Sequence, residues 1–316
     1  MQKQGSSPRR ILHKSAEGGC LRQDLGIVSI IGPGLIGGSI GLGLKARNLA
    51  GRVIGVGHRD ASLEKALEMH AVDHATKDLK EGVREADIVI LCTSVKLIPV
   101  IAKKVMPWMK VGSIITDVGS TKRGIVEKIM ALNRGSRSIS DKGVKFIGGH
   151  PLAGSEQRGI TAARPDLFQG ATCILTPTGG DSQARDVVKG MWEALGAKVR
   201  FLSPKEHDLI MAFISHLPQL VATSLVNTLQ PGQLAFTSRG FKDLTRIASS
   251  DPTLWRDILL QNREALLEAI NDFQKEIALL KKALLEKNSK RLFARLKRAK
   301  SRRNKLLDNK SYASQN

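Results

Sequence analysis

Cysteine is scarce in this chain, with three among 316 residues, at positions 20, 92 and 173. So few cysteines exclude a disulfide-stabilised fold, and their wide spacing fits no zinc or redox motif. We therefore expect a protein of a reducing compartment, the cytoplasm, with no bound metal.

Acidic and aromatic residues are also few. Asp and Glu number 29 against 50 Lys and Arg, which gives a net charge of +21, and aromatic residues make up 4% of the chain. Such a charge attracts anions, among them nucleic acid, anionic lipid and small phosphates or carboxylates. A single tyrosine, few aromatics to stack bases and no recognised nucleic-acid motif argue against nucleic acid as the main partner. A binder of acidic surfaces stays the competing class.

The basic charge is densest between residues 281 and 305, where twelve Lys or Arg accompany one acid, Glu286. Leucine and isoleucine recur near this segment at roughly helical spacing, at positions 277, 280, 284, 292 and 296. The pattern predicts an amphipathic helical end with a solvated basic face.

No stretch reads clearly as a signal peptide or a membrane span. Residues 1–24 lack an apolar core region, which predicts a disordered basic tail, with an organelle transit peptide as the alternative. Residues 209–238 carry no charged side chain and are long enough to cross a bilayer. Polar residues and a proline between 215 and 228 interrupt them, so we expect a helix buried in a domain or dimer, and no membrane partner.

The chain does contain a regular alternation of strand and helix patterns. Its 41% apolar and 25% charged residues are globular, and its length suits about two domains. Short apolar runs predict strands at 25–31, 52–56, 87–92, 112–117, 144–148, 171–176 and 197–201. Helical patterns lie between them at 35–48, 61–70, 98–109, 122–132 and 182–195. This predicts an α/β fold with a Rossmann-type parallel sheet covered on both faces.

After Pro204 the strand signals stop, and helical patterns cover 205–229, 240–249, 252–287 and 288–306. We therefore predict a dinucleotide-binding domain at 25–203 and an all-helical substrate and dimerisation domain at 204–307, between tails at 1–24 and 308–316. The uncharged run at 209–238 is too apolar for the surface of a monomer and too polar for a membrane. This favours a homodimer built by the helical domain.

The motif Gly32-x-Gly34-x-x-Gly37 follows a strand and opens a helix, which is the context of a dinucleotide fingerprint. Such glycines permit a tight turn, close approach of the pyrophosphate and close packing of helix on strand. The helix N-terminus then offers unpaired N–H groups to the phosphates. A glycine turn without ligand is the alternative. The expected cofactor contacts are Gly32, Gly34, Leu35, Ile36, Gly37, His58, Arg59, Thr93 and Ser94.

The end of the second strand bears on the choice of cofactor. NAD-binding folds usually place Asp or Glu there, about 20 residues past the glycine loop, to hold the ribose. Here the position is Gly57, followed by His58 and Arg59. A missing carboxylate removes a repulsion against a 2′-phosphate, with which Arg59 could pair. We predict NADP as the preferred cofactor, with NAD as the alternative if Asp60 serves the ribose.

Polar residues follow two further strand ends, where open α/β sheets bind their ligands. His150 comes just past the strand at 144–148, and histidine suits proton transfer near neutral pH, which favours catalysis over a structural role. Ser120 could hydrogen-bond a substrate or an imidazole, and Lys122 could meet a carboxylate. The alternatives are a helix N-cap at Ser120 and a solvated lysine.

Two more histidines, His207 and His216, lie in the helical half. Nine residues apart, they are not expected to share a helix face, which excludes a helical metal pair. Pro218 predicts a kink in the same helix. A buried, hydrogen-bonded histidine is the alternative to an active-site role for each.

Five motifs together resemble the TyrA family, the prephenate and arogenate dehydrogenases of tyrosine synthesis. In chain order they are GPGLIGGS (32–39), TDVGSTK (116–122), GGHPLAGSE (148–156), SHLP (215–218) and GFKDLTRIASSDPTLWRD (240–257). The resemblance spans about residues 25–290 and implies a nucleotide-binding first domain and a helical second domain that dimerises.

By this resemblance, His150 matches the catalytic histidine that binds the substrate hydroxyl, and Ser120 a serine that orients hydroxyl and cofactor. Arg246 matches the arginine that holds a substrate carboxylate. Secondary active-site positions by the same resemblance are His207, Glu156, Asp243 and Trp255. His216 and Lys122 are the further residues expected to bind substrate. Many members have His-Leu-Pro-His where this chain has Gln219 at the fourth position, so a ligand contact at that position is in doubt.

The implied reaction is NAD(P)-dependent oxidative decarboxylation of prephenate to 4-hydroxyphenylpyruvate and CO2. Oxidation of the ring alcohol removes a hydride and a proton, and a neutral His150 can accept the proton. The nicotinamide accepts the hydride, and Arg246 can bind a carboxylate through two parallel hydrogen bonds. Arogenate, which differs by an amino group and gives tyrosine directly, is the alternative substrate.

Overall fold

The computed structural model describes residues 24–135, 140–154, 157–179 and 181–307. These residues form two compact units, one ending at Arg263 and the other beginning at Glu264. The predicted tails at 1–24 and 308–316 lie outside the described residues, apart from Asp24.

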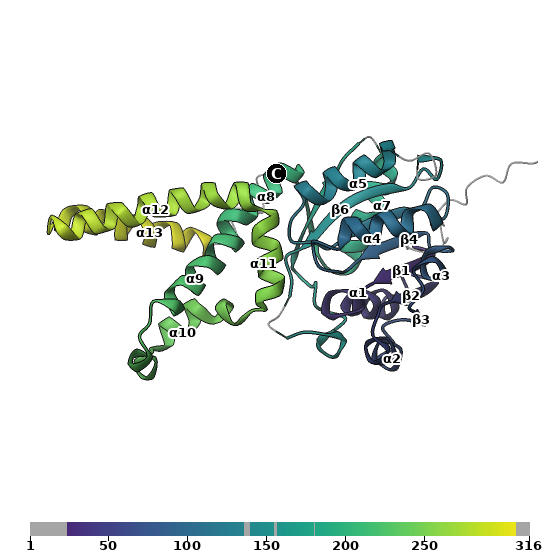
Figure 1. Ribbon diagram of the computed structural model, residues 1–316, viewed down its shortest axis with the longest axis horizontal. Helices are drawn as coiled ribbons and strands as arrows, with labels where there is room; N and C mark the ends of the chain where they lie inside the picture. Colours follow the sequence, from purple (N-terminus) through teal and green to yellow (C-terminus); the bar gives the residue numbers. More distant parts are fainter. Residues whose placement is uncertain (1–23, 136–139, 155–156, 180, 308–316) are drawn as a thin grey trace, which may run out of the picture. The chain divides into compact units, whose positions relative to one another are not determined.

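The first unit is built on one eight-stranded sheet in the order β3-β2-β1-β4-β5-β6-β7-β8 (Figure 1). Its strands are β1 (Ile27–Ile31), β2 (Arg52–Val56), β3 (His74–Thr76), β4 (Ile88–Leu91), β5 (Ile114–Asp117), β6 (Lys145–Pro151), β7 (Thr172–Pro177) and β8 (Lys198–Phe201). The order reverses direction between β1 and β4, which is where doubly wound sheets bind dinucleotides.

The predicted Rossmann-type parallel sheet is confirmed, with one pairing that the prediction did not include, because β7 runs antiparallel to β6. Every other neighbouring pair is parallel. The short elements β3 and α3 (Leu79–Val83) were not predicted from the sequence, since three to five residues are too few to show a period. The other predicted strands occur within a few residues of their expected bounds.

Helices cover both faces of the sheet, as the continuous apolar strands predict. Along β4 the side chains alternate between two cores: Ile88 and Ile90 enter one, and Val89 and Leu91 enter the other. The first core includes residues of α1 (Leu35–Ala46), α2 (Asp60–Glu68), the short turn η2 (Ile160–Ala162) and α7 (Ser182–Ala194). The second includes residues of α3, α4 (Ile98–Val105), η1 (Met106–Trp108) and α5 (Arg123–Gly135).

Helices complete the first unit after the sheet. They are α8 (Pro204–Met211), the π-helical turn η3 (Ala212–His216), α9 (Leu217–Asn227), η4 (Pro231–Phe236), α10 (Arg239–Thr245), η5 (Arg246–Ser249) and α11 (Pro252–Gln261). The single helix predicted at 252–287 is wrong: it ends at Gln261, and α12 (Arg263–Leu285) begins two residues later. The residue at the break, Asn262, is buried, and its amide binds groups of other helices.

The apolar helical stretch Pro204–Asn227 is long enough to cross a membrane by length and composition alone. Four of its polar side chains are nevertheless buried inside the first unit: His207, Asp208, His216 and Gln219. The expected burial of this helix is only partly seen within one chain, because 28% of its most apolar 18-residue window is buried and Phe213, Ile214 and Val226 are exposed.

The second unit consists of α12, from Glu264 onward, and α13 (Ser289–Leu307). Lys287, with φ of 50°, lies in the turn between them. Ion pairs join the two helices and the turn, among them Glu276 with Arg295 and Glu286 with Arg291. The predicted basic, amphipathic end of the chain is therefore a helical hairpin.

Candidate active site

His150 is the next-to-last residue of β6, at the carboxyl end of the strand. The pairing of β6 with β5 runs from Lys145 to Ile147, so His150 lies beyond the end of β5. The strand extends further than predicted, because its pairing with β7 continues to Pro151. Glycine precedes His150 for a steric reason: a Cβ on Gly149 would lie 2.7 Å from the carbonyl oxygen of Asp117.

His150 is hydrogen-bonded into a chain of three side chains. Its Nδ1 lies 2.9 Å from Nε2 of His207, and Nδ1 of His207 lies 2.8 Å from Oδ1 of Asp208. The Asp208 carboxylate accepts a hydrogen bond from Nδ1–H of His207, so Nε2 of His207 carries no proton and accepts a hydrogen bond from Nδ1–H of His150. The network therefore assigns an unprotonated Nε2 to His150, which makes this atom a proton acceptor.

Burial and the neighbouring groups keep the imidazole of His150 neutral. Burial holds the pKa of His150 well below its usual range, with additional lowering by His207, Lys122 and His216. Burial also lowers the pKa of His207, against an opposing hydrogen bond from Asp208. A neutral imidazole with a free acceptor atom can take a proton from a substrate hydroxyl.

Asp208 has a second role, at the start of α5. Its two carboxylate oxygens accept from the backbone N–H of Lys122, at 2.7 Å, and of Arg123, at 2.9 Å. These are N–H groups that a helix start leaves without an intrahelical partner. Asp208, from α8, therefore caps α5, and the alternative of an N-cap at Ser120 is not what the structure shows.

Lys122 is fully buried and forms an ion pair with Asp117, at the end of β5. Asp117 also accepts from the backbone N–H of Gly119, at 2.8 Å, and of Gly149, at 3.1 Å. The Lys122 ammonium is thus turned into the protein. This placement disagrees both with a solvated lysine and with direct binding of a substrate carboxylate.

His216 joins the same cluster through Asn262. The amide nitrogen of Asn262 lies 2.7 Å from the carbonyl oxygen of Asp208 and 2.9 Å from Nδ1 of His216. The π-helical turn η3 rotates His216 relative to a regular helix, so both helical histidines become fully buried in one cluster despite their spacing. Trp255 packs edge-on against His216, with ring centroids 6.1 Å apart.

Two buried polar atoms of this region have no hydrogen-bond partner among the residues that the structure describes: Nε2 of His216 and Oε1 of Gln219. Because Nδ1 of His216 accepts from Asn262, its proton lies on Nε2, which is left as an unsatisfied donor. Burial lowers the pKa of His216 to about 4, so the ring stays neutral. Unpaired buried donors and acceptors are costly unless a ligand satisfies them.

A cavity of about 560 Å³ lies at the switch point of the sheet, between the ends of β1, β2 and β4. Gly32 there has φ of 96°, a conformation that favours glycine, and the space above Gly34 is open. Gly34 is the N-cap of α1, and no side chain caps the helix there, which leaves N–H groups for a phosphate. These features fit a dinucleotide. The polar or charged residues of the lining include His58, Arg59, Ser62, Lys77, Thr93, Ser94 and Lys104.

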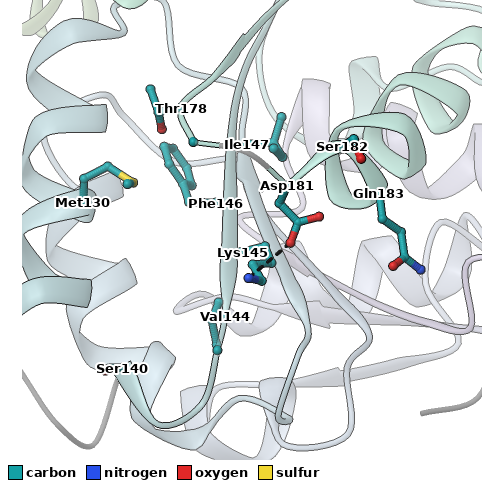
Figure 2. A pocket seen from close by; sticks show the side chains of 12 residues that line it. Met130, Ser140, Val144, Lys145, Phe146, Ile147, Thr178, Asp181, Ser182 and Gln183 are labelled. Atoms are coloured by element: carbon teal, nitrogen blue, oxygen red, sulfur yellow. Dashed lines mark ion pairs between the residues drawn. The ribbon is translucent and has the colours of Figure 1, made fainter.

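A second cavity has a volume of about 680 Å³ and is lined by residues at the start of β6, the end of the strand opposite His150. Figure 2 shows the side chains that line it. This cavity lies around the start of β6 and the start of α7, where Lys145 and Asp181 form an ion pair at 3.2 Å. Open α/β sheets bind their ligands at the carboxyl ends of the strands, and His150 lies at that end. The histidine cluster and the cavity of about 560 Å³ are therefore the candidate active site.

Comparison with known proteins identifies the family. Residues 40–201 match the family model described as prephenate dehydrogenase, nucleotide-binding domain, and residues 203–298 match prephenate dehydrogenase, dimerization domain. The chain belongs to the prephenate dehydrogenase family. It is an oxidoreductase of this family, as the sequence motifs predicted.

Individual relatives agree over most of the chain. Prephenate dehydrogenase of Bacillus subtilis is 36% identical over 88% of this chain and 76% of its own length. The structure of Aquifex aeolicus prephenate dehydrogenase with hydroxyphenyl propionate and NAD+ is 33% identical, with a TM-score of 0.81, covering 89% of this chain and 98% of that one. Arogenate dehydrogenase of Synechocystis is 31% identical, with a TM-score of 0.76, covering 89% and 99%.

Ser120 lies in the loop between β5 and α5, and the other residues predicted for the site fall into three groups. His150, His207 and His216 form one cluster, with Lys122 and Trp255 in contact with its members or their partners. Arg246 and Asp243 are exposed on η5 and α10, where Asp243 lies 3.8 Å from Arg239. Glu156 lies outside the described residues.

Of the predicted cofactor contacts, Gly32, Gly34, His58, Arg59, Thr93 and Ser94 line the cavity at the switch point. Leu35, Ile36 and Gly37 form the first turn of α1 directly after it.

Three residues of the cluster were not assigned a role from the sequence: Asp117, Asp208 and Asn262. Asp208 stands next to His207, and an acid beside a candidate histidine is a signal that could have been used. Asn262 lies inside a continuous helical pattern, where no sequence signal marks it.

Proposed function

We propose that this chain is a prephenate dehydrogenase, which converts prephenate and NADP or NAD to 4-hydroxyphenylpyruvate, CO2 and the reduced cofactor. The observation that carries the proposal is the Asp208–His207–His150 chain at the carboxyl end of the sheet. It ends in an unprotonated nitrogen suited to the hydroxyl of a ring alcohol.

In the proposed reaction, Nε2 of His150 accepts the proton of the ring hydroxyl as the alcohol is oxidised. The bound nicotinamide supplies the acceptor for the hydride that leaves the same carbon. Loss of the ring carboxylate as CO2 leaves electrons that make the ring aromatic, and His150 returns its proton to the phenolate oxygen. We propose Ser120, in the loop between β5 and α5, as the residue that orients the hydroxyl.

For the rest of the substrate we propose Arg246 as the carboxylate ligand, because its guanidinium can form two parallel charge-assisted hydrogen bonds. The unsatisfied Nε2–H of His216 supports a direct contact to substrate from that side. His207, Trp255, Asp243 and Glu156 are proposed as secondary residues of the site.

Arogenate is the second candidate substrate, favoured by the similarity to the Synechocystis arogenate dehydrogenase. A steady-state assay with prephenate and arogenate, each with NAD and NADP, decides between them. Turnover of prephenate with a higher kcat/KM supports the proposal, and activity with arogenate alone overturns it. No turnover of either would reject a cyclohexadienyl substrate.

For the cofactor we propose NADP. Arg59, Ser62 and Lys77 line the cavity beside Gly57, where NAD-specific folds usually have an acid. Asp60, the residue that could replace this acid, lies 2.6 Å from the Lys77 ammonium. The start of α2 also lacks a side-chain cap, which suits a phosphate.

The cofactor proposal is tested with Arg59→Ala, which should lower kcat/KM for NADP about tenfold or more and leave NAD nearly unchanged, the scale of a lost charge-assisted hydrogen bond. Lys65→Ala, on the exposed side of α2, is the matched control. A higher kcat/KM for NAD in the unmodified enzyme would contradict the proposal.

We further propose domains at 25–203 and 204–307, a homodimer formed by the second, and a cytoplasmic location. The family model that matches residues 203–298 is described as a dimerization domain. Light scattering at micromolar concentration should give twice the mass of the 34.3 kDa chain. The mass of one chain would contradict the dimer.

A further inference from the structure

The buried pair of Asp117 and Lys122 lies next to both residues proposed to handle the substrate hydroxyl. Oδ1 of Asp117 accepts from the backbone N–H of Gly149, directly before His150. Oδ2 accepts from the N–H of Gly119, directly before Ser120, and forms the ion pair with Lys122. One carboxylate thus ties the end of β6 to the loop after β5.

Lys122 connects the same carboxylate to the histidine chain. Its backbone N–H donates to Asp208, the residue that sets the tautomer of His207. Its ammonium group reaches Asp117, and both side chains are completely buried. Each charge is therefore balanced by the other in a place that water does not reach.

We propose that Asp117 and Lys122 are positioning residues. They fix the positions of His150 and Ser120 relative to each other, and they cancel each other's charge beside the hydrogen-bonded histidines. This inference rests on the proposed function. It assigns to Lys122 a task distinct from binding a substrate carboxylate, and to Asp117 a task that its sequence position alone does not indicate.

The opposite charges of Asp117 and Lys122 bear on the protonation of the nearby histidines. A buried carboxylate favours the protonated form of a nearby histidine, and a buried ammonium favours the neutral form. Among the residues that the structure describes, the charged or titratable groups around His150 are His207 and Asp208 of α8, His216 of η3, Lys122, Asp117, and Cys173 of β7. Removing one member of the pair leaves the other uncompensated among these groups.

The test is the pH dependence of kcat in three variants. The fall of kcat at low pH, here called the acidic limb, reports protonation of the histidine chain. In Lys122→Met, the remaining carboxylate should raise the apparent pKa of this limb by about one unit or more, the scale of a charge within a few ångströms. In Asp117→Asn, which keeps an amide oxygen as acceptor, the limb should move to lower pH. In the double variant it should return to within a few tenths of the unmodified value.

A merely structural role predicts a different result. Loss of packing would lower kcat in all three variants and leave the limb where it was, and this outcome overturns the proposal. Circular dichroism and cofactor affinity verify that each variant is folded. If Lys122→Met does not fold, Asp117→Asn and the double variant decide, since an unmoved limb in Asp117→Asn contradicts the charge balance.

The control for the proposed function is the unmodified enzyme. If it lacks dehydrogenase activity on both substrates, the proposed function has failed and not this inference. If it is active and the three variants show the same apparent pKa for the acidic limb of kcat, the inference alone has failed. Arg123→Ala at the next position, exposed on α5, should leave the limb unchanged.

Discussion

Nδ1 of His150 lies 2.9 Å from Nε2 of His207, although the two residues are 57 positions apart and come from a strand and a helix. Two neutral imidazoles at this distance share one proton, so the tautomer of His207 determines which ring nitrogen of His150 is unprotonated. Asp208, at the other end of this hydrogen-bond chain, determines which nitrogen of each ring carries the proton.

Replacing the proton acceptor should abolish most of the turnover. His150→Asn is expected to lower kcat by about a hundredfold or more, the usual scale for a lost general base, while cofactor binding persists. Stopped-flow turnover and fluorescence titration with NADP measure the two effects. Near-normal turnover would show that another group accepts the proton.

Removing the charge of Asp208 should affect both stability and turnover. Asp208→Asn removes the charge and replaces one of the two carboxylate oxygens by an NH2 donor, so the N–H groups of Lys122, Arg123 and His207 are left with one acceptor oxygen instead of two. This should cost about 1–3 kcal/mol of unfolding free energy. Urea unfolding measures the cost. Glu127→Gln, an exposed partner of Arg123 on α5, is the control and should change stability by less than about 0.5 kcal/mol.

Stability should fall in mild acid because of the buried histidines. The pKa of His216 drops from 6.5 to about 4 on folding, so between these values the unfolded chain binds more protons than the folded one. This stabilising contribution is complete above pH 6.5 and is lost as the pH falls, by up to about 3 kcal/mol for His216.

Urea unfolding at pH 7 and pH 4.5 tests the effect, with His216→Gln expected to show a smaller difference between the two. His70→Gln, an exposed histidine in the turn after α2, should keep the full difference. Equal acid sensitivity of His216→Gln and the unmodified chain would refute the assignment.

Losing the guanidinium at 246 should act on the substrate. Arg246→Ala is expected to raise KM for prephenate by an amount equal to about 1.5–3 kcal/mol of binding, with KM for the cofactor unchanged. Steady-state kinetics with each substrate varied in turn separates the two. A rise in the cofactor KM alone would place Arg246 at the other site.

Local patterns predicted much of the fold. The apolar runs that became β1, β2 and β4 and the glycine turn after β1 are contiguous in sequence, so they can be recognised without knowing their neighbours. The direction of β7 could not be predicted in this way, because an apolar strand looks the same whichever way its neighbour runs. The break of the last long helix at Asn262 was equally hidden, since the reason for it lies in Asp208 and His216.

The sequence by itself determined the family and the glycine turn after β1, and it predicted His150 as the proton acceptor, because each of these depends on residues that are close together in the chain. Only the tertiary structure decided what His150 can do. Asp208 and His207 reach it from α8, Asp117 holds the backbone before it from β5, and Lys122 balances Asp117 from the start of α5. Hydrogen bonds and charge balance act over ångströms in space and take no account of distance along the chain.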